Sequence, residues 1–372
     1  MSEKVLFTAS TFSHILNFHL PYLRNFQAQG WTVHAACGGR PAPIPFADEV
    51  LALPFEKSMY SPRNFQAAAR LRAKIVSEDY DLISTHTSLA AFFTRLALIG
   101  LEHRPQVANM VHGYLFDGET PPLKRAALLT AERWMAPKTD LLLTMNRWDF
   151  EAAKNYRLGK KVVHIPGVGV DFARLDQRNE DDRERLRTEW GIPGSAFVLF
   201  YAAEFSRRKS QSVLIRTMER LPENVVLVLA GEGVLLRECR EQARSLDAGR
   251  IIFPEYVQDP GPWYRAADAA VTASRIEGLP FNVMEAMYCG LPVVASAVKG
   301  HTDLIRDGET GLLYPYGDAD ACAGQIIRLM GSARLREDLS VLAREEVLLY
   351  GIDEVFPAVA GAYAALLPAV VS

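Results

Sequence analysis

Short runs of apolar residues alternate with amphipathic stretches along the whole chain. Five such runs in the first half are predicted strands, at 5–10, 32–37, 82–86, 107–113 and 141–145. These runs contain no Asp, Glu, Lys or Arg, as is typical of strands buried on both faces of a parallel sheet. The stretches between them, among them 63–78 and 121–135, have apolar positions at helical spacing. This alternation predicts an α/β fold with a parallel sheet.

The alternation is interrupted at 162–171, where Pro166, Gly167 and Gly169 punctuate the chain. A polar stretch follows, and the alternation then begins again. Five further strands are predicted at 197–203, 225–231, 251–257, 269–274 and 292–297. The sequence therefore predicts two doubly wound α/β units in tandem, followed by a helical pattern from Val341 onward.

The length of 372 residues exceeds what one ordinary core organises and suits two domains. We place a first Rossmann-like domain at 1–165 and a second at 166–345. Residues 346–372 are a helical segment and a candidate to pack back on the first domain. Ligands of doubly wound sheets bind at the carboxyl ends of the strands, so the expected site is a central cleft between the two units.

The segment 277–285, Glu-Gly-Leu-Pro-Phe-Asn-Val-Met-Glu, carries two carboxylates eight positions apart. Glu277 follows a predicted strand, Pro280 suits the first turn of a helix, and Glu285 lies one turn inside that helix. A loop carboxylate can accept hydrogen bonds from sugar hydroxyls, the N–H groups of a helix start attract phosphate, and a helical glutamate can bind both hydroxyls of a ribose. On local chemistry alone, a solvated helix start with acidic residues is the better-supported interpretation.

Arg207, Arg208 and Lys209 follow the predicted strand at 197–203 and precede a helix. Cations at such a turn can neutralise a diphosphate and the charge that develops as it leaves, and a solvated basic turn is the alternative. The glycines of Ala230-Gly-Glu-Gly lack the full dinucleotide fingerprint. This excludes a nicotinamide site and favours a plain turn.

Polar side chains also follow strands in the first half. His112, next to Gly113, follows one predicted strand and His86 ends the strand before it, so both are candidates to contact substrate. The loop after the first strand adds four polar residues: Ser13, His14, Asn17 and His19. With His86, Ser13, His14 and Asn17 are our candidates on the acceptor side. A lone histidine is more often structural, and the first loop can equally cap the helix that follows it.

Several function classes are excluded by missing patterns. No histidine or carboxylate spacing indicates a metal, and the four cysteines lie far apart, so we expect no metal site and no cofactor. No phosphate-binding loop of the ATPase type occurs, and no basic stripe is interleaved with aromatic residues as nucleic-acid binding requires. No apolar stretch is long enough to span a membrane, and the N-terminus does not resemble a signal peptide. Cytoplasmic localisation is therefore expected.

The charge is uneven. Residues 1–170 carry 19 Lys and Arg against 14 Asp and Glu, whereas the remainder carries 22 against 30. A basic first half hints at a surface that meets anionic lipid or phosphate, although chance scatter explains it equally well. The stretch 121–138 combines basic with apolar residues, as an interfacial helix does: Lys124, Arg125, Leu128, Leu129, Arg133, Trp134, Met135 and Lys138. An ordinary amphipathic helix of the core is the alternative.

Taken in order, these segments resemble the retaining family-4 glycosyltransferases of the GT-B fold, over nearly the whole chain. The likeness is greatest to bacterial enzymes that build capsule, exopolysaccharide or O-antigen units. In the first half it rests on the opening strand, loop and helix at 5–37, on MVHGYLF and on IPGVGVD. In the second half it rests on FSRRKS, LAGEG, the long stretch from WYRAADAAVTAS through EGLPFNVME to CGLPVVAS, and DGETGLLYPYGDAD.

The resemblance implies a role for each matching residue. Glu277 would contact the donor sugar, Glu285 the ribose, and Lys209 with Arg208 the diphosphate. His112 would contact the sugar near the reacting carbon. The implied catalytic residues are His112, Lys209 and Glu277. The implied donor contacts are Arg208, Lys209, Tyr256, Val257, Glu277, Gly278, Leu279, Phe281, Asn282 and Glu285, with the backbone of Tyr256 and Val257 reading the base.

The chain departs from the family pattern at three places. Ala203-Glu204 stands where many relatives have Gly-Arg, which removes one cation expected at the diphosphate; Arg207 or Arg208 is a candidate to replace it. Ser210 follows the lysine where glycine or asparagine is common. Pro254-Glu255 replaces a glycine before the turn that reads the base. These departures bear on the diphosphate and base contacts and leave the predicted fold unchanged.

The resemblance implies a retaining, metal-independent hexosyl- or N-acetylhexosaminyltransferase of bacterial surface polysaccharide synthesis. The expected donor is a nucleotide sugar, a UDP-sugar by family expectation. The expected acceptor is a glycan or a saccharide linked to polyprenyl diphosphate, reached from the cytoplasmic face of the inner membrane with peripheral contact and no nucleic acid. Two alternatives stay open: a hydrolysing epimerase on the same scaffold, and a non-catalytic protein that binds sugar nucleotides.

Overall fold

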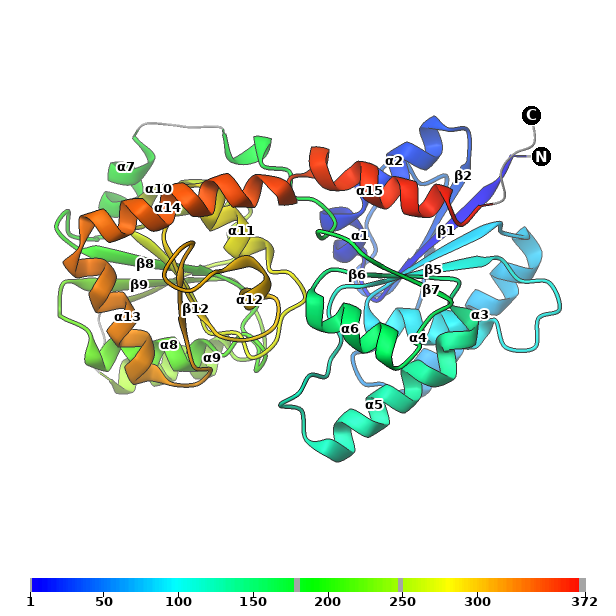
Figure 1. Cartoon of the computed structure of the whole chain (residues 1–372), viewed down its shortest axis with the longest axis horizontal. Coiled ribbons are helices and arrows are strands. Elements are labelled where there is room, and N and C mark those ends of the chain that lie inside the picture. Colours follow the sequence, from blue (N-terminus) through cyan, green and yellow to red (C-terminus); the bar gives the residue numbers. More distant parts are fainter. Residues whose placement is uncertain (1, 177–180, 247–249, 368–372) are drawn as a thin grey trace. The chain divides into compact units, whose positions relative to one another are not determined.

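The computed structural model describes residues 2–176, 181–246 and 250–367. The chain forms two compact units. The first comprises residues up to Gly169 together with the segment from Asp353 onward, and the second comprises Val170–Ile352. Each unit holds one parallel sheet with helices on both faces (Figure 1), which confirms the predicted α/β class with two Rossmann-like units.

The first sheet has seven parallel strands in the order β3-β2-β1-β4-β5-β6-β7. Its strands are β1 Lys4–Ala9, β2 Thr32–Cys37, β3 Glu49–Ala52, β4 Leu82–His86, β5 Gln106–Val111, β6 Leu141–Thr144 and β7 Lys161–His164. The helices of this unit are α1 Phe12–Phe18, α2 Leu20–Ala28, α3 Pro62–Glu78, α4 Ser88–Ala97, α5 Pro122–Met135 and α6 Arg147–Asn155, with α15 Ile352–Ala364 joining them from the far end of the chain.

The second sheet has six parallel strands in the order β10-β9-β8-β11-β12-β13. Its strands are β8 Phe197–Ala202, β9 Val225–Ala230, β10 Ile251–Glu255, β11 Ala269–Thr272, β12 Val293–Ser296 and β13 Leu312–Tyr314. Its helices are α7 Asp182–Glu189, α8 Gln211–Thr217, α9 Leu236–Ser245, α10 Gly261–Ala266, α11 Phe281–Tyr288, α12 His301–Leu304, α13 Ala319–Gly331 and α14 Ala333–Val347. In Figure 1, α8, α9 and α13 cover one face of this sheet and α10, α11 and α14 the other.

Most strands form where the sequence is apolar or at least uncharged. All six residues of β9 are buried, and so are all five of β4, because helices cover both faces of each sheet. All ten predicted strands are confirmed. Three edge strands were not predicted: β3 and β7, which are short and carry exposed polar residues, and β13, which has only three residues. β3 and β7 lie at the edges of their sheet, are only partly buried and lack a continuous apolar run, and β13 is too short to show one.

Helix ends follow the capping residues. Ser61 precedes Pro62 and accepts from the N–H of Arg63 at the start of α3, and Asn146 and Ser332 cap α6 and α14 in the same way. The helical pattern predicted from Val341 onward is interrupted at Gly351, whose extended backbone separates α14 from α15. The N–H of Val170 donates to the carbonyl of Tyr350, and the carbonyl of Val170 accepts from the N–H of Ile352. The two segments in which the chain passes from one unit to the other, the chain crossings, are thus paired with one another.

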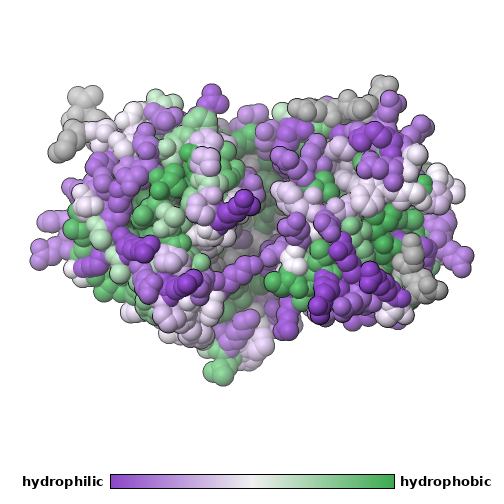
Figure 2. Space-filling model, turned by 180° about the vertical axis from the view of Figure 1, so that it is seen from behind, coloured by the Kyte–Doolittle hydropathy of each residue, from purple (hydrophilic) through white to green (hydrophobic). Residues whose placement is uncertain are grey.

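The surface is mostly polar, with some large apolar side chains exposed. Figure 2 shows one face, on which hydrophobic residues appear in scattered groups among hydrophilic ones. The part that lies lowest in both whole-molecule views, α5 and the loop before it, is hydrophobic at its tip. Leu123 and Trp134 of α5 are 86% and 59% exposed. No helix among the described residues is long and apolar enough to cross a membrane.

Candidate functional site

A buried carboxylate with two cationic partners lies at the carboxyl end of the second sheet. Glu277 follows β11 and is 5% exposed. Its Oε1 accepts from Lys209 Nζ at 2.5 Å and its Oε2 from Arg208 at 2.9 Å. Lys209 and Arg208 follow β8, the strand next to β11 in the sheet. The topology therefore brings together charges that lie about seventy positions apart in the sequence.

The charges of this group depend on one another. Burial alone would raise the pKa of the Glu277 carboxyl, but Lys209 and Arg208 more than offset it and lower that pKa to about 2. Burial lowers the pKa of Lys209, while Glu277 opposes this shift. We take both groups as ionised at neutral pH, because a 2.5 Å contact between a carboxylate and an ammonium is a charge-assisted hydrogen bond. Each Glu277 oxygen keeps a lone pair for a further donor.

Gly300 and His301, at the start of α12, form the wall behind Glu277. Gly300 has φ +83°, and a Cβ there would lie 2.7 Å from the Gly278 carbonyl oxygen and 2.8 Å from the Glu277 Cβ. His301 Nδ1 lies 2.8 Å from the carbonyl oxygen of Ser296, and the buried Nε2 has no hydrogen-bond partner among the described residues. Burial lowers the pKa of His301 to about 4, so the ring is neutral. His301 was not predicted, although the Gly-His pair after a strand is a recognisable signal.

Glu285, the second carboxylate of the motif, is also buried and also paired. Tyr264 of α10 donates to its Oε2 at 3.0 Å and to the Asn282 carbonyl at 3.1 Å. Arg174 donates to Oε1. Neither Tyr264 nor Arg174 was predicted, because both lie outside the motif and reach it through packing. Arg174 is half exposed, so it can move when Glu285 takes another donor.

The helix that carries Glu285, α11, begins at Phe281. Pro280 is its N-cap residue, with φ −78° and ψ 118°, so the prediction that Pro280 lies in the first turn was wrong by one position. The proline cannot extend the helix backward and has no side chain to cap it. In the part of the chain that the structure describes, no side chain caps this helix start. Leu279 is buried, and Phe281 and Asn282 form the first turn.

The remaining predicted residues of this unit lie at the ends of neighbouring strands. Tyr256 and Val257 follow β10; Tyr256 is 67% exposed. The glycines Gly231 and Gly233 have φ +136° and +149°, and a Cβ on them would lie 2.1 and 2.4 Å from the carbonyl oxygens of Ala203 and Phe205. The interpretation of these glycines as a plain turn was therefore incomplete, because they let the loop after β9 approach the loop after β8.

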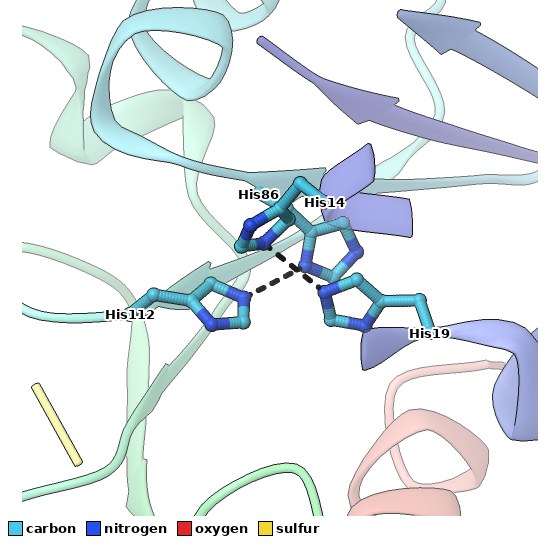
Figure 3. Close-up of side chains that lie close together, drawn as sticks. All are labelled: His14, His19, His86 and His112. Atoms are coloured by element: carbon cyan, nitrogen blue, oxygen red, sulfur yellow. Dashed lines mark hydrogen bonds between the residues drawn. The ribbon is translucent and has the colours of Figure 1, made fainter. Parts of the chain in front are cut away.

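In the first unit, four histidines converge at the carboxyl end of the sheet. His14 lies in α1, His19 at its end, His86 at the end of β4, and His112 directly after β5 (Figure 3). The ring nitrogens available for binding lie within 4.8 Å of one another. Burial lowers the pKa of His14 to about 4 and keeps the pKa of the other three well below the usual range, so all four imidazoles are neutral. Ser13 and Asn17 are exposed on α1 and do not belong to this histidine cluster.

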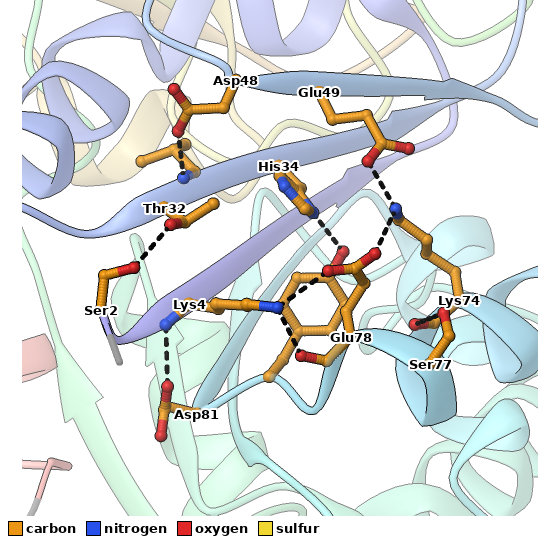
Figure 4. A network of polar contacts seen from close by, with 12 residues as sticks. Ser2, Lys4, Thr32, His34, Asp48, Glu49, Lys74, Ser77, Glu78 and Asp81 are labelled. Atoms are coloured by element: carbon orange, nitrogen blue, oxygen red, sulfur yellow. Dashed lines mark hydrogen bonds and ion pairs between the residues drawn. The ribbon is translucent and has the colours of Figure 1, made fainter.

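The opposite edge of this sheet holds ion pairs of a different kind. Lys4 and Lys74 both donate to Glu78, at 2.9 and 3.0 Å, and Lys74 also reaches Glu49 (Figure 4). Their positions at the amino ends of the strands separate them from the histidine cluster. Part of the basic surplus of the first half is thus used in joining α3 to the sheet.

Comparison with known proteins shows the family of this chain. The family described as "Glycosyltransferase Family 4" matches residues 22–174, and "Glycosyl transferases group 1" matches residues 182–346. EpsD of Bacillus subtilis (strain 168), a protein named as a glycosyltransferase, is 32% identical over 99% of this chain and 98% of its own length. The chain belongs to the family-4 glycosyltransferases of the GT-B fold.

Two further kinds of relative are more distant. The D-inositol 3-phosphate glycosyltransferase of Streptomyces bingchenggensis (strain BCW-1) is 27% identical over 77% of this chain and 66% of its own. Among solved structures, HepE of Anabaena in complex with UDP and glucose has a TM-score of 0.79 at 18% identity, covering 98% of this chain and 100% of its own. Sucrose-phosphate synthase of Thermosynechococcus elongatus has a TM-score of 0.80 at 21% identity, with 98% and 99% covered. At these identities the two structures show the fold alone.

Proposed function

We propose that this glycosyltransferase moves a sugar, with retention of anomeric configuration, from a UDP-sugar to a glycan or lipid-linked saccharide of bacterial surface polysaccharide. The observation that carries the proposal is the buried Glu277 between Lys209 and Arg208, beside the start of α11. EpsD, similar over nearly the whole chain, and the HepE structure with UDP and glucose support it. The retaining route and the nucleotide remain parts of the proposal.

The charges of the site suit a leaving diphosphate. Lys209 and Arg208 carry two positive charges against one on Glu277, so the group has a net positive charge that a diphosphate would neutralise. The positive end of the α11 dipole adds to this field. As the bond to the sugar breaks, negative charge grows on the phosphate oxygen and these groups stabilise it, with no metal required in the step.

Retention needs no nucleophile from the protein in a front-face route. The acceptor hydroxyl forms its bond to the anomeric carbon on the side that the diphosphate leaves, and its proton passes to the departing phosphate oxygen. The sugar then passes through an oxocarbenium-like state. Glu277 would hold the sugar hydroxyls through its remaining lone pairs, and Glu285 would hold the ribose. The contact of His112 with the sugar stays a prediction.

The structure bears on donor binding in one further way. Glu285 is already paired with Tyr264 and Arg174. A ribose would therefore replace Arg174, which is half exposed, while Tyr264 keeps the carboxylate in place. Donor binding is expected to release Arg174 toward solvent or toward the diphosphate.

Contact with a membrane surface is the second part of the proposal. Helix α5 is held to the core through Glu132, which accepts from the buried Arg95 at 2.9 Å. Its outer side exposes Leu123 and Trp134 together with Lys124 and Arg133. Apolar residues flanked by cations suit an anionic lipid interface, from which a polyprenyl-linked acceptor would be reached.

A donor screen with product analysis tests the function. UDP-, GDP- and dTDP-sugars are compared by thermal shift, and the best donor is then incubated with lipid-extract acceptors. Mass spectrometry is expected to find the acceptor with one added hexose or N-acetylhexosamine and NMR to find a retained anomeric configuration. An epimerised sugar formed from the donor alone would identify an epimerase, and binding without turnover over a wide acceptor panel would identify a non-catalytic protein.

A further inference from the structure

The histidine cluster of the first unit gathers four ligands of one chemical kind at one point. His14 and His19 come from α1 and its end, His86 from β4 and His112 from the residue after β5. Figure 3 shows the four rings turned toward one another. The Nε2 atoms of His14 and His19 lie 3.4 Å apart, and so do His112 Nε2 and His86 Nδ1.

These distances are long for hydrogen bonds and suit a shared ion. A good N–H donor lies about 2.7–3.2 Å from its acceptor. In a tetrahedral zinc site, with zinc–nitrogen bonds of about 2.0–2.1 Å, neighbouring nitrogens lie about 3.3–3.4 Å apart. We propose that the histidine cluster binds one divalent transition-metal ion of the zinc class, a site that the sequence pattern did not predict.

The type of ligand atom limits which metals can bind. The cluster consists of imidazoles alone, without a carboxylate or a thiolate, among the residues that the structure describes. Imidazole favours zinc, copper, nickel and cobalt, whereas magnesium and calcium take oxygen ligands. The neutral rings described above offer lone pairs without first losing a proton.

The surroundings fix the orientation of one ligand. His86 Nε2 lies 2.9 Å from Ser84 Oγ, which in turn lies 2.7 Å from the hydroxyl of Tyr363 in α15. A His86 that donates from Nε2 to Ser84 presents its Nδ1 lone pair to the cluster, which is the outer-shell arrangement of metal-bound histidines. Through this chain of contacts the metal would join α1, β4 and β5 to α15.

The number of protein ligands follows from the ring geometry. The rings of His19 and His86 are close to stacked, with centroids 3.7 Å apart and planes inclined by 33°. A metal lies in the plane of each ring that binds it, so one of these two must turn if all four are to bind. Without such a turn, the metal has three protein ligands: His14, His112 and either His19 or His86. A water then completes the tetrahedron, whereas after the turn all four histidines complete it.

Metal titration of the tag-free full-length protein, first freed of metal with EDTA, tests the site without any donor or acceptor. Isothermal titration with zinc is expected to give one ion per chain, and cobalt to give the visible absorption of a tetrahedral nitrogen site. The variant His14→Ala/His112→Ala removes two half-buried ligands, and zinc affinity is expected to fall at least about a hundredfold, more than a lost outer-shell contact costs. Equal zinc affinity in this variant and the wild type would overturn the proposal.

Two further variants keep the test decisive. His103→Ala/His164→Ala removes two exposed histidines of the same unit, and zinc binding is expected to stay unchanged. Ser84→Ala leaves every ligand in place, and affinity is expected to fall about tenfold, the scale of an outer-shell loss. If the double ligand variant is unfolded by circular dichroism, Ser84→Ala decides: unchanged affinity there would sink the site. The inference does not rest on the proposed function. If a sugar donor still shifts the melting temperature in EDTA, the donor site forms without the metal, and failure of the metal site would not affect the proposed function.

Discussion

The hydroxyl of Tyr264 lies 3.0 Å from Glu285 Oε2 and joins α10 to α11 at the second carboxylate of the motif. The same hydroxyl lies 3.1 Å from the carbonyl oxygen of Asn282, so it fixes the first turn of α11 as well as the side chain. The orientation of Glu285 is therefore set by a residue twenty-one positions upstream.

Replacing Glu277 or Lys209 is expected to lower turnover strongly. Glu277→Gln removes the charge that orients Lys209, and Lys209→Ala removes a cation from the leaving diphosphate; each is expected to reduce kcat by at least about a hundredfold. Asp338→Asn and Arg334→Ala, an exposed ion pair on α14, serve as controls and should change kcat by less than about threefold. Near-normal turnover in either site variant would remove its residue from the mechanism.

Glu285 and Tyr264 are expected to act on donor affinity rather than on turnover. Glu285→Gln should raise the Kd for the donor with little change in kcat. Tyr264→Phe removes one hydrogen bond to a carboxylate, worth about 1 kcal/mol or more, so the Kd should rise about five- to tenfold. Titration calorimetry with the donor measures both, and an unchanged Kd in Glu285→Gln would exclude its contact with the ribose.

Gly300→Ala is expected to damage the site without touching a charged group. The added methyl meets the Gly278 carbonyl and the Glu277 Cβ, and φ at this position is +83°. The free energy of unfolding should fall by about 1–3 kcal/mol, and kcat should fall with it because Glu277 is displaced. Gly324→Ala is the matched control, since that glycine lies within α13 with open space around it, and should raise stability by about 0.5–1 kcal/mol. A Gly300→Ala protein as stable and active as the wild type would refute the close packing.

His301 is expected to make the second unit sensitive to acid. Its pKa is lowered to about 4 by burial, whereas the unfolded chain protonates near 6.5. The unfolded state therefore binds the extra proton first, and the stability present above pH 6.5 is lost as the pH falls through this window toward 4. Between pH 7.5 and pH 5 the loss should be about 2 kcal/mol. Urea denaturation of His301→Gln should show a pH dependence smaller by this amount, and that of the exposed His103→Gln should match the wild type.

Helix α5 is expected to bind anionic vesicles at low salt. Leu123→Glu/Trp134→Glu replaces two exposed apolar residues with negative charges, which an anionic membrane repels. The fraction of protein that co-sediments with the vesicles should therefore fall severalfold. Val341→Glu/Leu349→Glu makes the same charge change at two exposed apolar residues of the second unit and should leave binding unchanged. A wild-type protein that stays in the supernatant at low salt would count against membrane contact.

Most strands that the sequence predicted have buried faces on both sides, and the edge strand β10, which is only partly buried, was predicted from its apolar start. β9 is continuously apolar and β4 carries no charged residue, because helices cover both strands, and such runs are recognisable in the sequence. β7 was not recognised as a strand because Lys161 and His164 are exposed. At the candidate site, too, local sequence patterns were predictable and contacts made by packing were not. Glu277 and Glu285 belong to a local motif and were predicted, but their partners Tyr264, Arg174 and His301 meet them only through the packing of helices. No metal-ligand spacing in the sequence indicates the histidine cluster, since its members come from α1 and its end, from the end of β4 and from the residue after β5.

The paired crossings at Val170 and Gly351 have a consequence for the order in which the protein is built. The first unit is interrupted in the sequence by the whole of the second, and its helix α15 is synthesised after the second unit. The second unit is continuous and has all its strands before α15 exists, so it can complete its folding during synthesis. Until then the first unit lacks the contacts that Phe356 and Tyr363 make with Tyr22 and Phe26 of α2. Truncation before Asp353 would therefore destabilise the first unit, although the second unit is the nearer one in the sequence.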